Sequence, residues 1–389
     1  DIPVSEALKG LDNITPKYDT QKQVFQQILT YLDQANTEMG ALKSTNYILA
    51  SDFYYGNNLT KWQKAVNAFK LRVLIQLSNK ETDADLNIKQ KFADVINNPT
   101  KYPLFASAAD QLQFVHNSQY NKYSTNPDNF GFDATRYNLA ATYLNSLVAI
   151  QDPRTFFVAE PAAAKVAAGA APNTYAAFNG ASSGEDLATM SKNAGLGQYS
   201  FINRKRYYQT YTAENTIVVG YSEMCFNIAE AMNRGWITSG SAETWYQNGI
   251  KASLAFYGIK DGVNTVTFQK PGGGLFESVN YDVNFLYDTY YNQADVKYKG
   301  NTVDGRNQIL LQKYLAFYQN SGQEAYFNWR RTGVPTFLVG SGSGNSGRVA
   351  LRYQYPSVER SINKTNVEAA ITAQFGTLDD INGKMWIIK

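Results

Sequence analysis

The chain is poor in the residues that most catalytic and metal sites need. It has one cysteine, Cys225, and one histidine, His116, among 389 residues. A disulfide within the chain is therefore impossible, and zinc sites built from Cys and His are excluded. A Ser-His-Asp or Cys-His arrangement would have to use His116, which no motif surrounds. Cys225 lies on the apolar stripe of a predicted helix, where we expect a small buried side chain.

Strong net charge and long apolar runs are also missing. The formal charge is +3, and no run of Lys or Arg reaches the density that a phosphate backbone requires, so we expect no nucleic-acid partner. No apolar stretch approaches the ~20 residues that span a bilayer, and no signal-peptide pattern opens the chain. No loop carries the spaced acidic residues of a calcium site, and we expect no metal and no cofactor.

Aromatic residues, in contrast, are abundant. The chain contains 28 Tyr and 21 Phe, and hydrophobic residues make up 44% of it. This composition allows a large core and argues against disorder.

The pattern of apolar residues in 221–258 predicts two amphipathic helices joined by a short polar turn. Apolar side chains recur three and four residues apart in both halves. In the second half, the small residues Ala242 and Gly249 flank Tyr246, a row that is typical of the second helix of a tetratricopeptide repeat. One such pair cannot bury both of its faces, so we expect it to stack on further pairs. An ordinary helical hairpin is the alternative.

Similar periodicity predicts further helices, separated by long irregular parts. We expect them near residues 20–40, 59–78, 85–97, 138–150, 307–318 and 363–375, with another starting at 323. The helical repeat parts are then about 19–98, 217–258 and 306–332, and the irregular parts about 102–216 and 262–305. Long irregular segments in a compact domain are usually functional or disordered. The many aromatic residues argue against disorder here.

Four segments together resemble the SusD-like (SusD/RagB) family. They are LTKWQKAVNAFKLRVLIQLSN at 59–79, YSEMCFNIAEAMNRGW at 221–236 with QNGIKASLAFYGI after it, ILLQKYLAFYQNSGQEAYFNWRRTGVP at 309–335, and RYQYP at 352–356 followed by Glu359 and Asn363. They occur in the family's order and cover most of the chain outside the irregular parts.

The resemblance implies a single all-α domain over residues 1–389, in which a tetratricopeptide-like helical superhelix supports a large irregular, loop-rich ligand-binding part. It also implies a non-catalytic lipoprotein on the cell surface, in the outer membrane of a Bacteroidetes-type bacterium. Such a protein captures oligosaccharide for import by a SusC-like TonB-dependent transporter. Some family members take peptides or other nutrients instead.

The resemblance further implies an N-terminal signal and a lipidated cysteine. Neither occurs in these 389 residues. We therefore expect the N-terminal section of the family, with its lipid anchor to the membrane, to be missing from this chain.

The irregular part between residues 173 and 211 has the side chains that a sugar site needs. Tyr rings stack on the apolar faces of sugars, and Asn or Arg side chains satisfy the hydroxyl groups. In the family, the stacking residues lie in loops before the central helix pair. We expect stacking from Tyr175, Tyr199, Tyr207 and Tyr208, with polar contacts from Asn173, Asn179, Asn203 and Arg204. Packing of each tyrosine against the helices is the alternative.

Two other functions stay open at this stage. An all-α glycosidase needs two carboxylates across a cleft, and the irregular part offers Glu185 and Asp186, which are neighbours and so rarely face each other across a substrate. A scaffold whose helical groove binds a protein segment is the other alternative. We expect Arg330 and Arg331 to hold helix ends or carboxylates.

Overall fold

The computed structural model describes residues 1–45, 47–133, 136–274, 276–376 and 378–389. Its helices are α1 (Gln21–Ser44), α2 (Leu59–Gln76), α3 (Ile88–Asn97), α4 (Phe130–Asp133), α5 (Ala141–Ala149), α6 (Thr155–Val158), α7 (Ala163–Ala167), α8 (Leu187–Gly195), α9 (Arg204–Tyr208), α10 (Tyr221–Asn233), α11 (Ala242–Phe256), α12 (Tyr287–Tyr291), α13 (Val303–Ala316), α14 (Glu324–Thr332), α15 (Ser357–Ile362) and α16 (Lys364–Phe375). Its strands are β1 (Leu112–Phe114), β2 (Thr216–Val219), β3 (Gly262–Gln269) and β4 (Ser278–Phe285).

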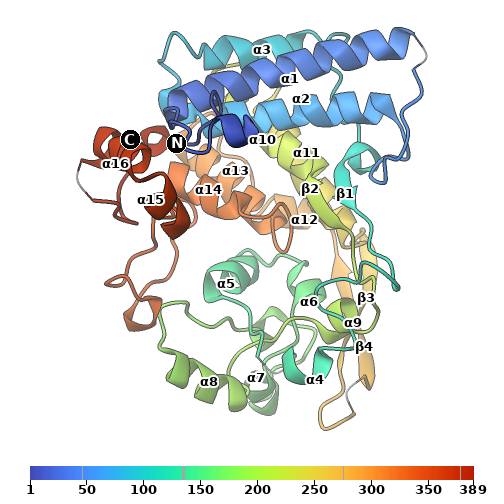
Figure 1. The fold of residues 1–389 in the computed structure, drawn as a ribbon. Coiled ribbons are helices and arrows are strands. Elements are labelled where there is room, and N and C mark those ends of the chain that lie inside the picture. Colours follow the sequence, from blue (N-terminus) through green and yellow to red (C-terminus); the bar gives the residue numbers. More distant parts are fainter. Residues whose placement is uncertain (46, 134–135, 275, 377) are drawn as a thin grey trace.

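Long helices form one side of the molecule, and short helices and loops form the other (Figure 1). The hairpins α1–α2 and α10–α11 each pack face to face, and α10 also contacts α2 and α13. The described strands form only two antiparallel two-stranded sheets, β1–β2 and β3–β4. The prediction of an all-α fold built from helical pairs is confirmed.

Local sequence signals set the starts of the first two helices. The Thr20 side chain accepts a hydrogen bond from the Gln23 backbone N–H, and the Gln23 side chain accepts one from the Thr20 N–H, which forms a capping box. Asn58 caps α2 by accepting from the Lys61 N–H. Both helices therefore begin within one residue of the predicted positions.

Helix α10 is the centre of the helical part, because every residue from Glu223 to Asn233 is buried. Its two acidic residues are paired inside the core. Arg72 donates from Nε to Glu223 Oε1 at 2.6 Å, and Arg331 donates from Nη2 to Glu230 Oε2 at 2.8 Å. Burial alone would raise the pKa of Glu230, but the charge and hydrogen bonds of Arg331 outweigh it and lower that pKa to about 2.

A second buried pair attaches the loop-rich part to the helices. Arg154, fully buried just before α6, donates from Nε to Asp152 Oδ1 at 2.9 Å. Its two terminal nitrogens donate to Ser253 Oγ on α11 at 2.8 Å and to Gln312 Oε1 on α13 at 2.7 Å. The loop after α5 is thereby fixed against both helices.

The prediction that residues 262–305 are irregular is wrong for residues 262–291, which contain β3, β4 and α12. Strands β3 and β4 pair over their full length, from Gly262 opposite Phe285 to Gln269 opposite Ser278. Val266 and Phe268 are buried on one face of β3 and alternate with more exposed residues. Asn and Asp, which are rare in strands, occupy several positions of β3 and β4, and Gly272, Gly273 and Gly274 after β3 resemble a flexible bend, so the sequence indicated loop.

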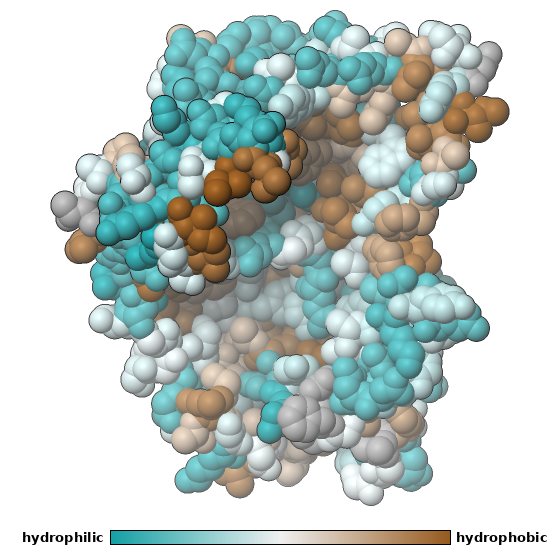
Figure 2. All heavy atoms as spheres, viewed as in Figure 1, coloured by the Kyte–Doolittle hydropathy of each residue, from teal (hydrophilic) through white to brown (hydrophobic). Residues whose placement is uncertain are grey.

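No helix in the described ranges combines the length and apolar character needed to cross a bilayer. The face seen in Figure 1 is hollowed between the helical part and the loop-rich part, as Figure 2 shows.

Candidate functional site

A cleft of ≈ 520 Å³ lies in the loop-rich part, between the loop after α6, the segment before α9 and the β3–β4 hairpin. Aromatic side chains line much of it: Tyr199, Phe201, Phe268 and Tyr281. Phe268 is buried, and the other three rings are half-buried. Glu160, Arg204, Gln269 and Lys270 are its charged and amide-bearing side chains.

Glu160 forms hydrogen bonds that connect the three segments around the cleft. Its Oε1 accepts the Arg204 backbone N–H at 2.8 Å, and its Oε2 accepts the Gln269 backbone N–H at 2.9 Å. Burial raises the pKa of Glu160 to about 7, although these two hydrogen bonds favour the charged form. Because these two hydrogen bonds join the loop after α6 to α9 and to β3, Glu160 positions the walls of the cleft.

Arg204 enters the cleft from the first turn of α9. Asn203 caps this helix by accepting the Arg206 N–H at 2.8 Å, and its amide donates to the Thr267 carbonyl at 3.0 Å. The Arg204 guanidinium lies 5.8 Å from the centroid of the Phe201 ring. Burial lowers the pKa of Arg204, while Glu160 acts in the opposite direction. Arg204 thus places a charged hydrogen-bond donor beside an aromatic ring, and a sugar needs both, a ring for its apolar face and a polar group for its hydroxyls.

Tyr199 is fixed at the rim of the cleft by an acidic partner. Its hydroxyl donates to Glu185 Oε2 at 2.7 Å, and Asn193 donates to Glu185 Oε1 at 2.8 Å. Asp186 caps α8 by accepting the Thr189 N–H. Both carboxylates of the glycosidase alternative therefore have local structural partners.

Two of the predicted stacking residues belong to the core. Tyr207 and Tyr208 are each 0% exposed. Tyr207 packs near Tyr123 and Tyr318, and Tyr208 packs edge-on against Phe130 at 5.3 Å. The prediction that these two rings form an open stacking surface is wrong, because neighbouring aromatic side chains cover them.

Four other predicted residues hold loops in place. Tyr175 donates to the Gln151 carbonyl at 2.7 Å, Asn173 to the Asp282 carbonyl at 3.0 Å, and Asn179 to the Gln198 carbonyl at 3.0 Å. None of the three lines the cleft. Asn203 is buried and bonded at both ends of its amide, so the prediction that it meets a ligand is wrong as well.

The structure brings Tyr199 and Arg204 into one cleft, and their role in ligand binding stays a prediction. Sequence reasoning missed Phe201, Tyr281, Gln269 and Glu160. A weak signal existed for Tyr281, because Val279, Tyr281, Val283 and Phe285 alternate along β4 with polar residues. No local pattern marks Glu160, whose partners lie 44 and 109 residues away.

Comparisons with known proteins agree with one another. The SusD-like family model, described as starch-binding and associating with the outer membrane, matches residues 1–356. A SusD homologue from Bacteroides fragilis is similar at 30% identity and a TM-score of 0.86, with 100% of this chain and 80% of that chain covered. A second SusD homologue from the same species has 30% identity and a TM-score of 0.80, with 100% and 79% covered.

A chitin-binding protein is also similar, at 25% identity and a TM-score of 0.75, with 100% of this chain and 76% of that chain covered. The comparison with curated proteins found no match.

Proposed function

Because the chain belongs to the SusD-like family, and is thus a nutrient- or carbohydrate-binding protein of the outer membrane, we propose that it captures glycan in the cleft between the segment before α9 and the β3–β4 hairpin. The observation that carries the proposal is the composition of that cleft. Tyr199, Phe201 and Tyr281 present half-buried rings next to Arg204 and Gln269.

Sugars fit these side chains for a physical reason. The C–H faces of a sugar ring are apolar and pack on aromatic rings, while its hydroxyl groups need planar or charged donors and acceptors at the edges. A volume of ≈ 520 Å³ lies in the range of small-molecule sites, about 300–1,000 Å³, and accepts a short stretch of a longer glycan.

The protein binds this glycan without cleaving it. Glycoside hydrolysis needs one carboxyl that gives a proton and a second carboxylate across the bond. Glu160 accepts two backbone N–H groups with its two oxygens, and Glu185 is held by Tyr199 and Asn193. Glu160 is the one carboxyl among the described residues that line the cleft, so the pair that hydrolysis needs is not assembled there.

Capture at the cell surface also requires attachment and onward transport. From the family, we include in the proposal a lipid anchor in the outer membrane and a SusC-like TonB-dependent transporter that receives the glycan.

Affinity electrophoresis in gels that contain starch, xylan or glycol chitin tests glycan capture. The wild-type protein should be retarded by at least one polysaccharide. The variant Phe201→Ala/Tyr281→Ala should lose most of this retardation, because it removes two stacking faces. Tyr120→Ala, which removes a ring that is 85% exposed and does not line the cleft, is the control and should behave like the wild type. Equal retardation of all three proteins would contradict the assignment of the cleft.

The same glycans, incubated with the protein in solution, test the absence of catalysis. New reducing ends should not accumulate. If new reducing ends appeared at a rate proportional to the protein concentration, the protein would be an enzyme and the proposal of binding without cleavage would be wrong.

A further inference from the structure

A second groove, which shares no lining residue with the cleft, crosses the surface of α11. It measures ≈ 470 Å³ and lies between α11, the first turn of α10, the short 3-10 helix at Ala108–Asp110 and β2. Small residues, Ser222, Ala252 and Ala255, form part of its lining, and Tyr221 and Phe256 contribute half-buried rings. Small side chains therefore leave space in the groove, and aromatic rings lie beside that space.

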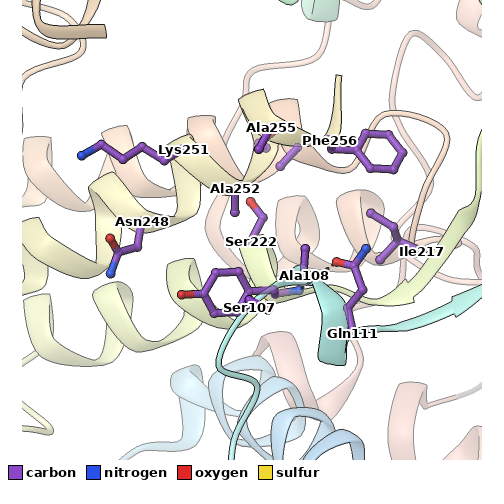
Figure 3. A pocket seen from close by; sticks show the side chains of 13 residues that line it. Ser107, Ala108, Gln111, Ile217, Ser222, Asn248, Lys251, Ala252, Ala255 and Phe256 are labelled. Carbon is purple, nitrogen blue, oxygen red and sulfur yellow. Dashed lines mark hydrogen bonds between the residues drawn. The ribbon is translucent and has the colours of Figure 1, made fainter. Parts of the chain in front are cut away.

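Two polar side chains at one end of this groove, Asn248 and Lys251, form no hydrogen bond or ion pair with the residues that the structure describes. Figure 3 shows Asn248 and Lys251 together at that end, and Phe256 and Ile217 at the other. Over the described parts of the chain, the Asn248 amide makes no hydrogen bond and Lys251 makes no ion pair. Lys251 instead places Nζ 4.6 Å from the centroid of the Tyr287 ring. By contrast, Gln111 accepts from the Tyr221 N–H and donates to Gln113.

We propose that the groove on α11 is a second carbohydrate-binding site, which takes one or two sugar rings of a glycan chain. Sugar faces pack against Phe256 and Tyr221, and sugar hydroxyl groups bond to the Asn248 amide and the Lys251 ammonium. This inference rests on the proposed function and extends it from one site to two. Two sites on one protein raise the retention of a polymer well above that of either site alone.

The surroundings of β2 favour a sugar over a peptide strand in this groove. A peptide that extends a sheet needs a free strand edge. Both backbone polar groups of Ile217 in β2 are already bonded outside the β1–β2 pair, because its N–H donates to Asn320 Oδ1 at 2.8 Å and its carbonyl accepts the Ser321 N–H at 2.7 Å. Ile217 is the residue of β2 that lines the groove, so the groove offers rings and side-chain polar groups, whereas the β2 backbone there has no free group for a peptide strand.

Equilibrium dialysis with short labelled sugars tests the second site. The probes are maltotriose, cellotriose, xylotriose and chitotriose, each too short to serve both sites by polymer avidity. We compare the wild type with Ala255→Trp, which fills the groove from an exposed position, and with the cleft variant Phe201→Ala/Tyr281→Ala. For at least one trisaccharide, the wild type should bind two molecules and each variant one.

A second variant, Asn248→Ala/Lys251→Ala, keeps the test decisive if Ala255→Trp folds poorly. Both side chains are at the surface end of the groove, so the circular dichroism spectrum should not change, while affinity at one of the two sites should fall about tenfold, which corresponds to about 1.4 kcal/mol.

The possible results separate the two proposals. One bound trisaccharide that is lost only in the cleft variant would overturn the second site and leave the proposed function intact. If instead a single trisaccharide binds and its binding is lost only in the groove variants, the result would support the site on α11 and overturn the assignment of the cleft. Absence of binding by every trisaccharide and every polysaccharide would overturn both.

Discussion

At the scale of single residues, two tyrosines of one segment have opposite environments. Tyr199 is half-buried at the rim of the cleft, whereas Tyr207 is 0% exposed. The sequence could not distinguish them, because α9 has only five residues and such a short element has no readable period. Burial of Tyr207 is decided by Tyr123 and Tyr318, which are distant in the chain.

We therefore expect Tyr207→Ala to lower the free energy of unfolding by about 3–5 kcal/mol, as other large core side chains do when truncated. Tyr199→Ala should lower it by less than about 1 kcal/mol, because the ring is at the rim. Urea denaturation followed by circular dichroism measures both. Similar losses in the two variants would show that the burial described for Tyr207 is wrong.

Glu160 predicts a pH dependence of stability. Its folded pKa of about 7 exceeds the ordinary value of 4.5, so the folded state keeps the proton over a range in which the unfolded state releases it. Stability then falls as the pH rises from 4.5 to 7, and the loss is complete above pH 7, at about 3 kcal/mol.

Urea denaturation of the wild type and of Glu160→Gln at pH 5 and pH 8 isolates this effect, since other titrations cancel in the difference. The stability of the variant is offset by a constant amount, because a Gln side chain cannot accept both backbone N–H groups with two oxygens, but it should lose less stability over this interval than the wild type. Parallel curves would mean that Glu160 titrates normally.

At the scale of elements, the hydrophobic period predicted the long helices and missed the hairpin. Residues 221–258 do form α10 and α11, and Gly249 does lie where two helices approach closely. The reason is geometric, since a Cβ at Gly249 would be 2.6 Å from the nearest atom of the Phe226 ring on α10. Strands β3 and β4 were missed because they contain Asn and Asp, which are rare in strands, and because Gly272, Gly273 and Gly274 follow β3, although apolar and polar residues alternate along β4. The cleft that the two strands help to form was therefore missed as well.

Gly249→Ala should destabilise the protein by about 1–3 kcal/mol, because the buried Phe226 ring must shift to admit the methyl group. The matched control is Gly195→Ala at the end of α8, where a Cβ meets nothing within 4 Å; that change should be neutral or slightly stabilising. Thermal unfolding of the two variants provides the comparison. A destabilisation equal to that of the control would refute the close contact between α10 and α11.

At the scale of the whole molecule, buried ion pairs join helices that are far apart in the chain. Arg72 on α2 meets Glu223 on α10, and Glu230 on α10 meets Arg331 on α14. The sequence predicted that Arg331 holds a carboxylate, and this is confirmed, but it could not name Glu230, which is 101 residues away.

Arg331→Met should cost about 3–5 kcal/mol, because it leaves the Glu230 carboxylate buried without its main partner. The neighbouring arginine is the control. Arg330 is half-buried, makes no ion pair in the described parts of the chain and donates one hydrogen bond, to the Leu351 carbonyl at 2.8 Å, so Arg330→Met should cost only about 1–2 kcal/mol. Chemical denaturation distinguishes them. If the two substitutions cost the same, the Glu230–Arg331 pair does not hold α10 to α14 in the way described.

A crystal structure of the protein soaked with a hexasaccharide of the polysaccharide that it retains tests the central claim most directly. We expect an intact sugar chain in the cleft, with rings stacked on Phe201 or Tyr281 and hydroxyl groups bonded to Arg204. An empty cleft beside a glycan bound elsewhere on the molecule would contradict the account.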